Sequence, residues 1–206
     1  RGKNLNSHPL LLIGADFNQA ALDSTQRMFS NNNNKPITVL ADISKPDTYA
    51  EKVFSNYSLN ISDFLNVRSF LDHNRRFKSK ARGTKHNKYT FKNITTNSFS
   101  WRGSLIKAQD IQIDLVEHFK KWRKYISKYG LLVLELHSIN IDDIYQNIGK
   151  IPMTAYLATH GFSDQFIIEY EVYRESIHLA GLNIDTKYEK IFPSQNTKMI
   201  SINLIS

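Results

Sequence analysis

Short apolar runs that alternate with helix-like segments constrain the fold of this chain most strongly. Residues 10–13 form a wholly apolar run that leads to Asp16, and residues 37–42 form a second run that ends on an acid. A third run occupies 64–71 and a fourth occupies 131–136. Runs of this kind are typical of strands buried on both faces of a parallel sheet. The pattern predicts an α/β fold with a doubly wound, mostly parallel sheet and right-handed crossovers.

Helical periodicity separates and follows these runs. Residues 18–30 have the pattern of a surface helix that ends in a turn. A later segment places four large apolar side chains on one helix face: Leu115, Phe119, Trp122 and Ile126. Ser163 is placed to cap another helix that ends before Gly181. Two final strand candidates, 188–192 and 199–205, predict a C-terminal antiparallel hairpin.

Composition excludes several classes of protein. With 206 residues, we expect a single domain over 1–206. The chain has no cysteine, which excludes disulfides, thiolate metal sites and a cysteine nucleophile. No apolar run reaches the roughly 18 to 20 residues of a membrane span, and the start lacks the pattern of a secretory signal. The expectation is therefore a cytoplasmic protein without a membrane partner.

The net charge of +8 belongs to one segment of the chain. No acid occurs between His73 and Gln109, whereas ten bases occur there: Arg75, Arg76, Lys78, Lys80, Arg82, Lys85, Lys88, Lys92, Arg102 and Lys107. Residues 77–103 lack a clear periodicity, which predicts a long basic loop or lid. This loop is either a solvated surface or a docking surface for an acidic or phosphate-bearing partner, and both interpretations stay open.

Two acids end successive predicted strands, Asp16 after the first and Asp42 after the second. Ligands of open α/β sheets bind at the carboxyl ends of the strands. One acid can accept hydrogen bonds from both hydroxyls of a ribose, and the next can accept one from the amine of adenine. Asp16 and Asp42, with the adjoining Phe17 and Ile43, are therefore candidate residues for binding an adenosine cofactor. Alternatively, both aspartates cap helices.

The eight glycines are too far apart to form a glycine-rich nucleotide-binding turn. The cradle that the first β–α turn of such a fold usually provides is therefore not found in these residues. Two explanations remain: the chain is the later part of a larger domain, or it is a degenerate copy. We expect the former, because losing a central first strand would leave two interior strands with unpaired edges.

Polar residues at two further strand ends are candidates for chemistry. His137 follows the fourth strand, and His160 and Gln165 precede the last predicted helix. Two imidazoles and a carboxamide can hold an octahedral divalent metal, for which iron or manganese suits better than zinc. The alternative is that these histidines are not ligands. His73, beside Asp72 at the third strand end, is a candidate catalytic base or a residue that holds the adjoining loop.

Several motifs, in the same order, resemble the metal-dependent class I methyltransferase domains found in polyketide synthases. They are FLNVRSFLDHNR (64–75), LVEHF (115–119), GLLVLELH (130–137), TAY (154–156), ATHGFSDQ (158–165) and SINL (201–204). The likeness extends from about Pro9 to the end of the chain.

This resemblance implies C-methylation by S-adenosylmethionine of a malonyl-type unit carried on acyl carrier protein. It matches Asp16 with the ribose-binding acid and Asp42 with the residue beside adenine. It also matches His137, His160 and Gln165 with the metal site, where iron or manganese acts as a Lewis acid on the acceptor. The basic loop then fits an acidic carrier protein and its phosphopantetheine arm.

Two other functions compete with this interpretation. The missing glycine-rich turn suggests a non-catalytic methyltransferase-like domain that docks partners. The basic segment suggests a nucleic-acid methyltransferase or binder, although we expect nucleic acid to be the less favoured partner.

Overall fold

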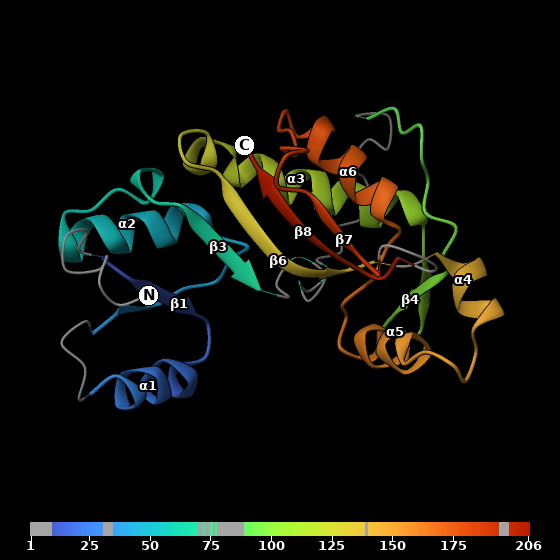
Figure 1. Ribbon diagram of the computed structural model, residues 1–206, viewed down its shortest axis with the longest axis horizontal. Coiled ribbons are helices and arrows are strands. Elements are labelled where there is room, and N and C mark those ends of the chain that lie inside the picture. Colours follow the sequence, from blue (N-terminus) through green and yellow to red (C-terminus); the bar gives the residue numbers. More distant parts are fainter. Residues whose placement is uncertain are drawn as a thin grey trace. The chain divides into compact units, whose positions relative to one another are not determined.

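The computed structural model describes residues 10–30, 35–69, 72, 75, 77, 89–138, 140–193 and 198–206 (Figure 1). The chain divides into two compact units, residues 1–61 and 62–206, and each is described by itself. The smaller unit contains a parallel pair of strands. The larger unit contains a mixed sheet and a separate hairpin.

The smaller unit is a strand–helix–strand arrangement followed by a second helix. Its elements are β1 (Ile13–Asp16), α1 (Gln19–Met28), β2 (Ile37–Leu40) and α2 (Pro46–Tyr57). β1 and β2 pair in parallel, with Asp16 opposite Leu40. The side chain of Asn18 caps α1 by accepting the N–H of Ala20, and Pro46 opens α2 where no N–H donor is needed. The alternation predicted for this region is confirmed.

The main sheet of the larger unit has four strands in the order β3, β6, β8, β7. Their bounds are β3 (Asn66–Ser69), β6 (Leu131–His137), β7 (Lys190–Phe192) and β8 (Ile200–Ile205). β3 and β6 are parallel, whereas β8 is antiparallel to both β6 and β7. The predicted C-terminal hairpin is thus confirmed.

The predicted doubly wound, mostly parallel sheet is not found among the described strands. The described strands form three small sheets, and the largest of them is mixed. β8 lies between β6 and β7 and runs against both, so only the β3–β6 pair of this sheet is parallel. With strands of three to seven residues, each pairing is held by few backbone hydrogen bonds. The fold is mixed α/β, with small sheets in place of one large parallel one.

Two helices, α3 (Ala108–Ile126) and α6 (Tyr170–Leu179), pack against each other in the larger unit (Figure 1). The four apolar side chains predicted for one face of α3 are all buried. Phe119 makes an edge-to-face contact with Tyr173 of α6 at 5.6 Å between ring centroids. Among the described residues, no helix combines the length and hydrophobicity needed to cross a membrane.

The remaining elements lie, in chain order, between those already described. They are the 3-10 turn η2 (Ile61–Asp63), β4 (Phe99–Trp101), β5 (Ser104–Ile106), α4 (Ile141–Gln146) and α5 (Met153–Phe162). β4 and β5 form an antiparallel hairpin, so the last residues of the predicted loop 77–103 are a strand. Residues 78–88 of that loop lie outside the described residues.

The predicted helix start at Ser163 is wrong. Ser163 is the C-terminal cap of α5, and its N–H donates to the carbonyls of Thr159 and His160. Asp164 then has a left-handed backbone with φ of 61°, which ends the helix. α6 begins only at Tyr170. A serine before an apolar run can stand at either end of a helix. Here the residues before Ser163 belong to α5, so Ser163 stands at a C-terminal end.

Gly130 links α3 to β6, at a position where any other residue would be strained. Its φ is +85°, and an added Cβ would lie 3.0 Å from both the carbonyl oxygen of Ile205 and a methyl carbon of Leu204. The backbone at Gly130 therefore passes close to β8 immediately before Leu131, the first residue of β6, which pairs with Ile205.

Candidate functional site

The predicted cofactor residues lie at one end of the parallel pair in the smaller unit. Asp16 ends β1 and Asp42 follows β2 by two residues. The Asp16 carboxylate accepts the N–H of Asn18 at 2.8 Å, and the Asp42 carboxylate accepts the N–H of Ser44 at 2.8 Å. Both aspartates therefore shape the turns that precede α1 and α2, but neither is a helix cap, because the N-terminal cap residues are Asn18 and Lys45. Their role toward a cofactor stays a prediction.

The two neighbours predicted to contact a cofactor differ in exposure. The Phe17 side chain is 75% exposed, whereas Ile43 is half-buried. An exposed aromatic ring beside a strand-end acid is available to cover a flat ligand. Ile43 lies between Asp42 and Ser44, in the turn that the Asp42 carboxylate closes.

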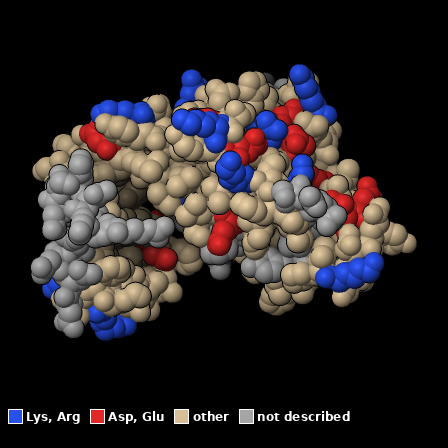
Figure 2. All heavy atoms as spheres, in the orientation of Figure 1, with Lys and Arg blue, Asp and Glu red and all other residues tan. Residues whose placement is uncertain are grey.

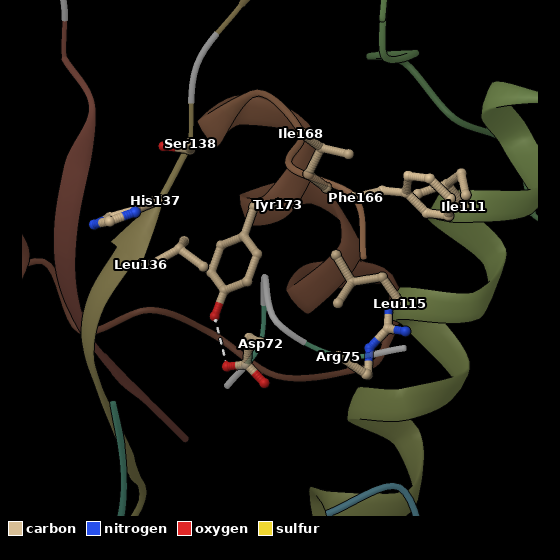
Figure 3. Close-up of a pocket in the computed structure, with 10 residues that line it drawn as sticks. All are labelled: Asp72, Arg75, Ile111, Leu115, Leu136, His137, Ser138, Phe166, Ile168 and Tyr173. Atoms are coloured by element: carbon tan, nitrogen blue, oxygen red, sulfur yellow. Dashed lines mark hydrogen bonds between the residues drawn. The ribbon is translucent and has the colours of Figure 1, made fainter. Parts of the chain in front are cut away.

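A small cavity lies at the ends of β3 and β6 in the larger unit (Figure 3). Its volume of about 20 Å³ is enough for one water molecule. α3 and α6 also contribute to its walls. Figure 3 shows the Leu136 side chain pointing toward the Tyr173 ring, whereas the His137 ring lies on the other side of β6. This alternation follows from the geometry of a strand.

Asp72, at one wall of this cavity, is the centre of a buried network. Arg68 donates from Nη1 to Asp72 Oδ1 at 2.7 Å, and the Tyr173 hydroxyl donates to Asp72 Oδ2 at 3.2 Å. His118 Nε2 lies 3.1 Å from Arg68 Nη1, and because arginine only donates, Nε2 accepts. The Arg68 guanidinium also stacks over Trp122 at 4.1 Å. Both carboxylate oxygens of Asp72 are thus used within the protein.

The charge states of this network follow from burial. Burial alone would raise the pKa of Asp72, but the charge of Arg68 and the interactions with Arg68 and His118 together outweigh it, so the pKa lies well below its usual range. Burial raises the pKa of Tyr173 well above its usual value, so the hydroxyl keeps its proton and donates to Asp72. The network is therefore one ion pair with neutral hydrogen-bonding partners.

His118 should make the stability of the protein depend on pH. Burial, together with the charges of Arg68 and Arg75, lowers the pKa of His118 to about 3, although Asp72 opposes this shift. Between pH 6.5 and about 3, the unfolded chain binds a proton that the folded chain does not. This histidine therefore contributes stability above pH 6.5 that is lost as the pH falls, by up to about 1.4 kcal/mol per pH unit.

Urea denaturation between pH 7 and 4 tests this expectation. A His118→Gln variant keeps an acceptor for Arg68 but does not titrate, so its free energy of unfolding should fall less steeply than that of the wild type. Asp72 adds a slope of the same sign only below about pH 4, where its unfolded form begins to bind protons. Equal slopes for the two proteins above pH 4 would show that folding does not shift the pKa of His118.

The three predicted metal ligands come from two neighbouring parts of the larger unit. His137 ends β6, His160 lies in α5, and Gln165 follows α5. Burial lowers the pKa of His137, and the charge of His160 lowers it further, so the two imidazoles are near enough to influence each other. The backbone N–H of Gln165 donates to the His160 carbonyl at 2.8 Å. These two interactions link the three residues without showing that their side chains converge, and their role toward a metal stays a prediction.

The described part of the chain contains no group of three or more His, Asp or Glu residues placed to hold a metal. A site at His137 and His160 would therefore need the Gln165 carboxamide as its third protein donor. His73, the other predicted catalytic residue, lies outside the described residues. Its neighbour Arg75 is described and forms a mostly buried ion pair with Asp114 of α3.

Sequence reasoning missed most of the buried network, although two signals could have found it. Arg68 is a charge within an apolar run, and Asp72 follows it at a spacing that puts both on the same face of a strand. A buried charge requires a partner, so the pair was predictable. His118 lies three residues after Leu115 on the apolar face of α3, which predicts its burial but not its contact with Arg68.

On the face that Figure 2 shows, the charged side chains of the described residues do not gather into one patch. On the face in Figure 2, Lys and Arg side chains of the larger unit are interspersed with Asp and Glu. Arg174, for example, lies 3.8 Å from Glu171 and 3.7 Å from Glu189. Of the ten bases between His73 and Gln109, only Arg75, Lys92, Arg102 and Lys107 are described.

Comparison with known protein families shows to which family the chain is related. A methyltransferase family model described as "AprA MT2-like domain" matches residues 1–203. The chain belongs to this family. A search of curated proteins found no match. Family membership confirms the resemblance to methyltransferase domains of the apratoxin synthase. The sequence motifs quoted above resemble, within that synthase, its first methyltransferase domain. Family membership also identifies the chain as a methyltransferase-family domain and implies S-adenosylmethionine as the methyl donor.

Proposed function

We propose that this domain transfers a methyl group from S-adenosylmethionine to the carbon of a malonyl-type unit carried on acyl carrier protein. One observation supports the proposal within a methyltransferase family: the charge of His160 lowers the pKa of His137 at the end of β6, and the backbone N–H of Gln165 donates to the His160 carbonyl. Strand ends of α/β proteins are where ligands bind. Imidazole and carboxamide groups together are suited to a divalent ion with positions left for an oxygen-donor substrate.

The donor set fits a divalent iron or manganese ion in one chemical respect. The lowered pKa of His137 keeps its imidazole neutral at pH 7, which is the form that binds metals. Three neutral donors leave the full positive charge of the ion available to an anionic acceptor. When bound, such an ion supplies Lewis acidity that lowers the pKa of the malonyl carbon acid.

The remaining steps assign roles to residues of the chain. The acceptor carbon loses a proton to a base, and its electron pair forms a bond to the methyl carbon as the bond to sulfur breaks, so S-adenosylhomocysteine leaves. This requires in-line placement of the two reactants. His73 is the candidate base, and Asp16 and Asp42 are the candidates for holding the ribose and adenine.

Mass spectrometry of the full-length protein's reaction tests this function. Malonyl-loaded carrier protein incubated with S-adenosylmethionine should gain 14 Da per methyl group, a mass that follows from replacing hydrogen by methyl. Dialysis against a chelator should abolish the gain, and Fe(II) or Mn(II) should restore it. Methyl transfer that survives complete removal of metal would contradict the Lewis-acid role but not the methyltransferase activity.

The second candidate is a non-catalytic methyltransferase-like domain that docks partners. It is favoured by the wide spacing of the eight glycines, which leaves these residues without a glycine-rich cofactor turn. Calorimetry with S-adenosylmethionine on the full-length protein separates the two candidates. Binding supports the enzyme, whereas no heat of binding at millimolar ligand supports the docking domain.

A further inference from the structure

An open groove lies between the β4–β5 hairpin and α5. Its volume of about 660 Å³ is in the range of small-molecule binding sites. One wall is formed by Ser98, Phe99 and Ser100, and the other by Leu157, Ala158 and Gly161 of α5. The groove thus combines apolar surface with hydroxyl groups.

This groove borders the candidate metal residues. Gly161 on its wall follows His160 directly, and Phe166 at its end follows Gln165 directly. Phe166 also lines the cavity at the ends of β3 and β6. This half-buried ring packs edge-to-face against Phe77 at 5.8 Å and Phe99 at 5.2 Å. The same side chain therefore lines both the groove and the cavity at the strand ends.

The polar features of the groove suit an extended chain that contains amides. Two consecutive residues of β4, Phe99 and Ser100, line it together with the preceding Ser98. Because successive side chains of a strand alternate, the backbone of β4 must also border it. Among the described residues, β4 pairs only with β5, so backbone groups on its other edge are available to a ligand. Arg102, stacked on Trp101 at 4.6 Å, places a cation in the groove wall.

We propose that the groove binds the phosphopantetheine arm of the carrier protein, with Arg102 facing its phosphate and Phe166 at its thioester end. This inference rests on the proposed function, because that function supplies the arm. The arm is a flexible chain with two amides and an anionic phosphate, and these groups match the strand edge and the guanidinium. Leu157, Phe99 and Phe166 then contact its aliphatic parts.

Site-directed crosslinking tests the groove without requiring catalysis. The chain has no cysteine, so a Gly161→Cys variant carries a single thiol in the groove. Carrier protein whose arm thiol is activated as a 2-pyridyl disulfide should react with it, forming a disulfide and releasing 2-thiopyridone. Thr159→Cys is the matched control, because residues two apart on a helix point to opposite sides and Thr159 does not line the groove.

We expect the Gly161→Cys variant to crosslink at least about tenfold faster than the Thr159→Cys variant, owing to the bound arm. Equal rates, or a faster Thr159→Cys reaction, would overturn the inference. This outcome is distinguishable from failure of the proposed function. Selective crosslinking without methyl transfer would contradict the function alone, and methyl transfer without selective crosslinking would contradict the groove alone.

A second variant fills the groove. No atom lies within 4 Å of a Cβ added at Gly161, and its backbone is helical, so Gly161→Leu should fold at least as well as the wild type. Its kcat/KM for carrier-bound substrate should fall by about 10- to 100-fold because the arm is displaced. Ala155→Leu, on the exposed surface of the same helix, should have little effect. An unchanged kcat/KM for Gly161→Leu would contradict the inference.

Discussion

Replacement of His137 by alanine is expected to lower methyl transfer by at least about 100-fold and to abolish tight binding of Fe(II) or Mn(II). The imidazole ends β6 beside His160, so its loss removes one of three proposed donors. Because His137 is only half-buried, the free energy of unfolding should change little. Two measurements check this: turnover of malonyl-carrier protein, and retained metal after dialysis by elemental mass spectrometry.

His178→Ala is the control for this variant. His178 is an exposed histidine in the last turn of α6, where it does not contribute to the proposed site. It should retain wild-type turnover and metal content. If His137→Ala keeps its metal and its activity, the proposed metal site at the end of β6 is wrong. If it keeps the metal but loses activity, His137 acts on the substrate instead.

Asp72→Asn should lower the free energy of unfolding by about 3 to 5 kcal/mol. Asparagine keeps the shape of the side chain and can still accept the Tyr173 hydroxyl, so no cavity forms. The Arg68 guanidinium, however, stays buried at 4% exposure and loses its anionic partner at 2.7 Å. Urea denaturation at pH 7 measures the loss.

Asp63→Asn provides the matched comparison. Asp63 forms an ion pair of similar length, 2.8 Å, with Lys128, but both side chains are about half exposed. Water screens this pair, so its loss should cost less than about 1 kcal/mol. Adding Arg68→Met to Asp72→Asn should restore part of the stability, because no uncompensated charge then remains. A cost below about 1 kcal/mol for Asp72→Asn would show that water reaches Arg68.

Local sequence patterns correctly predicted those elements in which the apolar side chains recur with a single period, either that of a helix or that of a strand. The apolar face of α3 is such a case, since Leu115, Phe119, Trp122 and Ile126 are all buried. The hairpin of β7 and β8 is another, because two β-rich runs flank a short turn. Helix starts were less predictable. Ser163 has the residue type of an N-terminal cap, yet it closes α5, and α6 begins at Tyr170.

Part of the candidate site could likewise be predicted from the sequence, and part of it could not. Strand-end position alone singled out His137, Asp16 and Asp42, and all three lie at or just beyond the ends of strands. The groove beside α5 could not be predicted, because 77–103 lacks a periodicity from which to predict β4, and the groove exists only where the hairpin of β4 and β5 faces α5. Nothing in the sequence distinguishes its cation, Arg102, from the other nine bases between His73 and Gln109.

The run 64–71 shows what the sequence by itself determined and what only the tertiary structure decided. Its β-rich character predicted the strand β3, and the position of Asp72 predicted an acid just after it, but the predicted burial on both faces is wrong, because Leu65 and Val67 are about half exposed. The tertiary structure decided that this acid binds Arg68 and Tyr173, so both of its carboxylate oxygens accept hydrogen bonds within the core. The reason is physical: the tendency to form a strand follows from the local sequence, whereas burial and the partner of a buried charge depend on residues up to 101 positions away, which only folding brings within hydrogen-bonding distance.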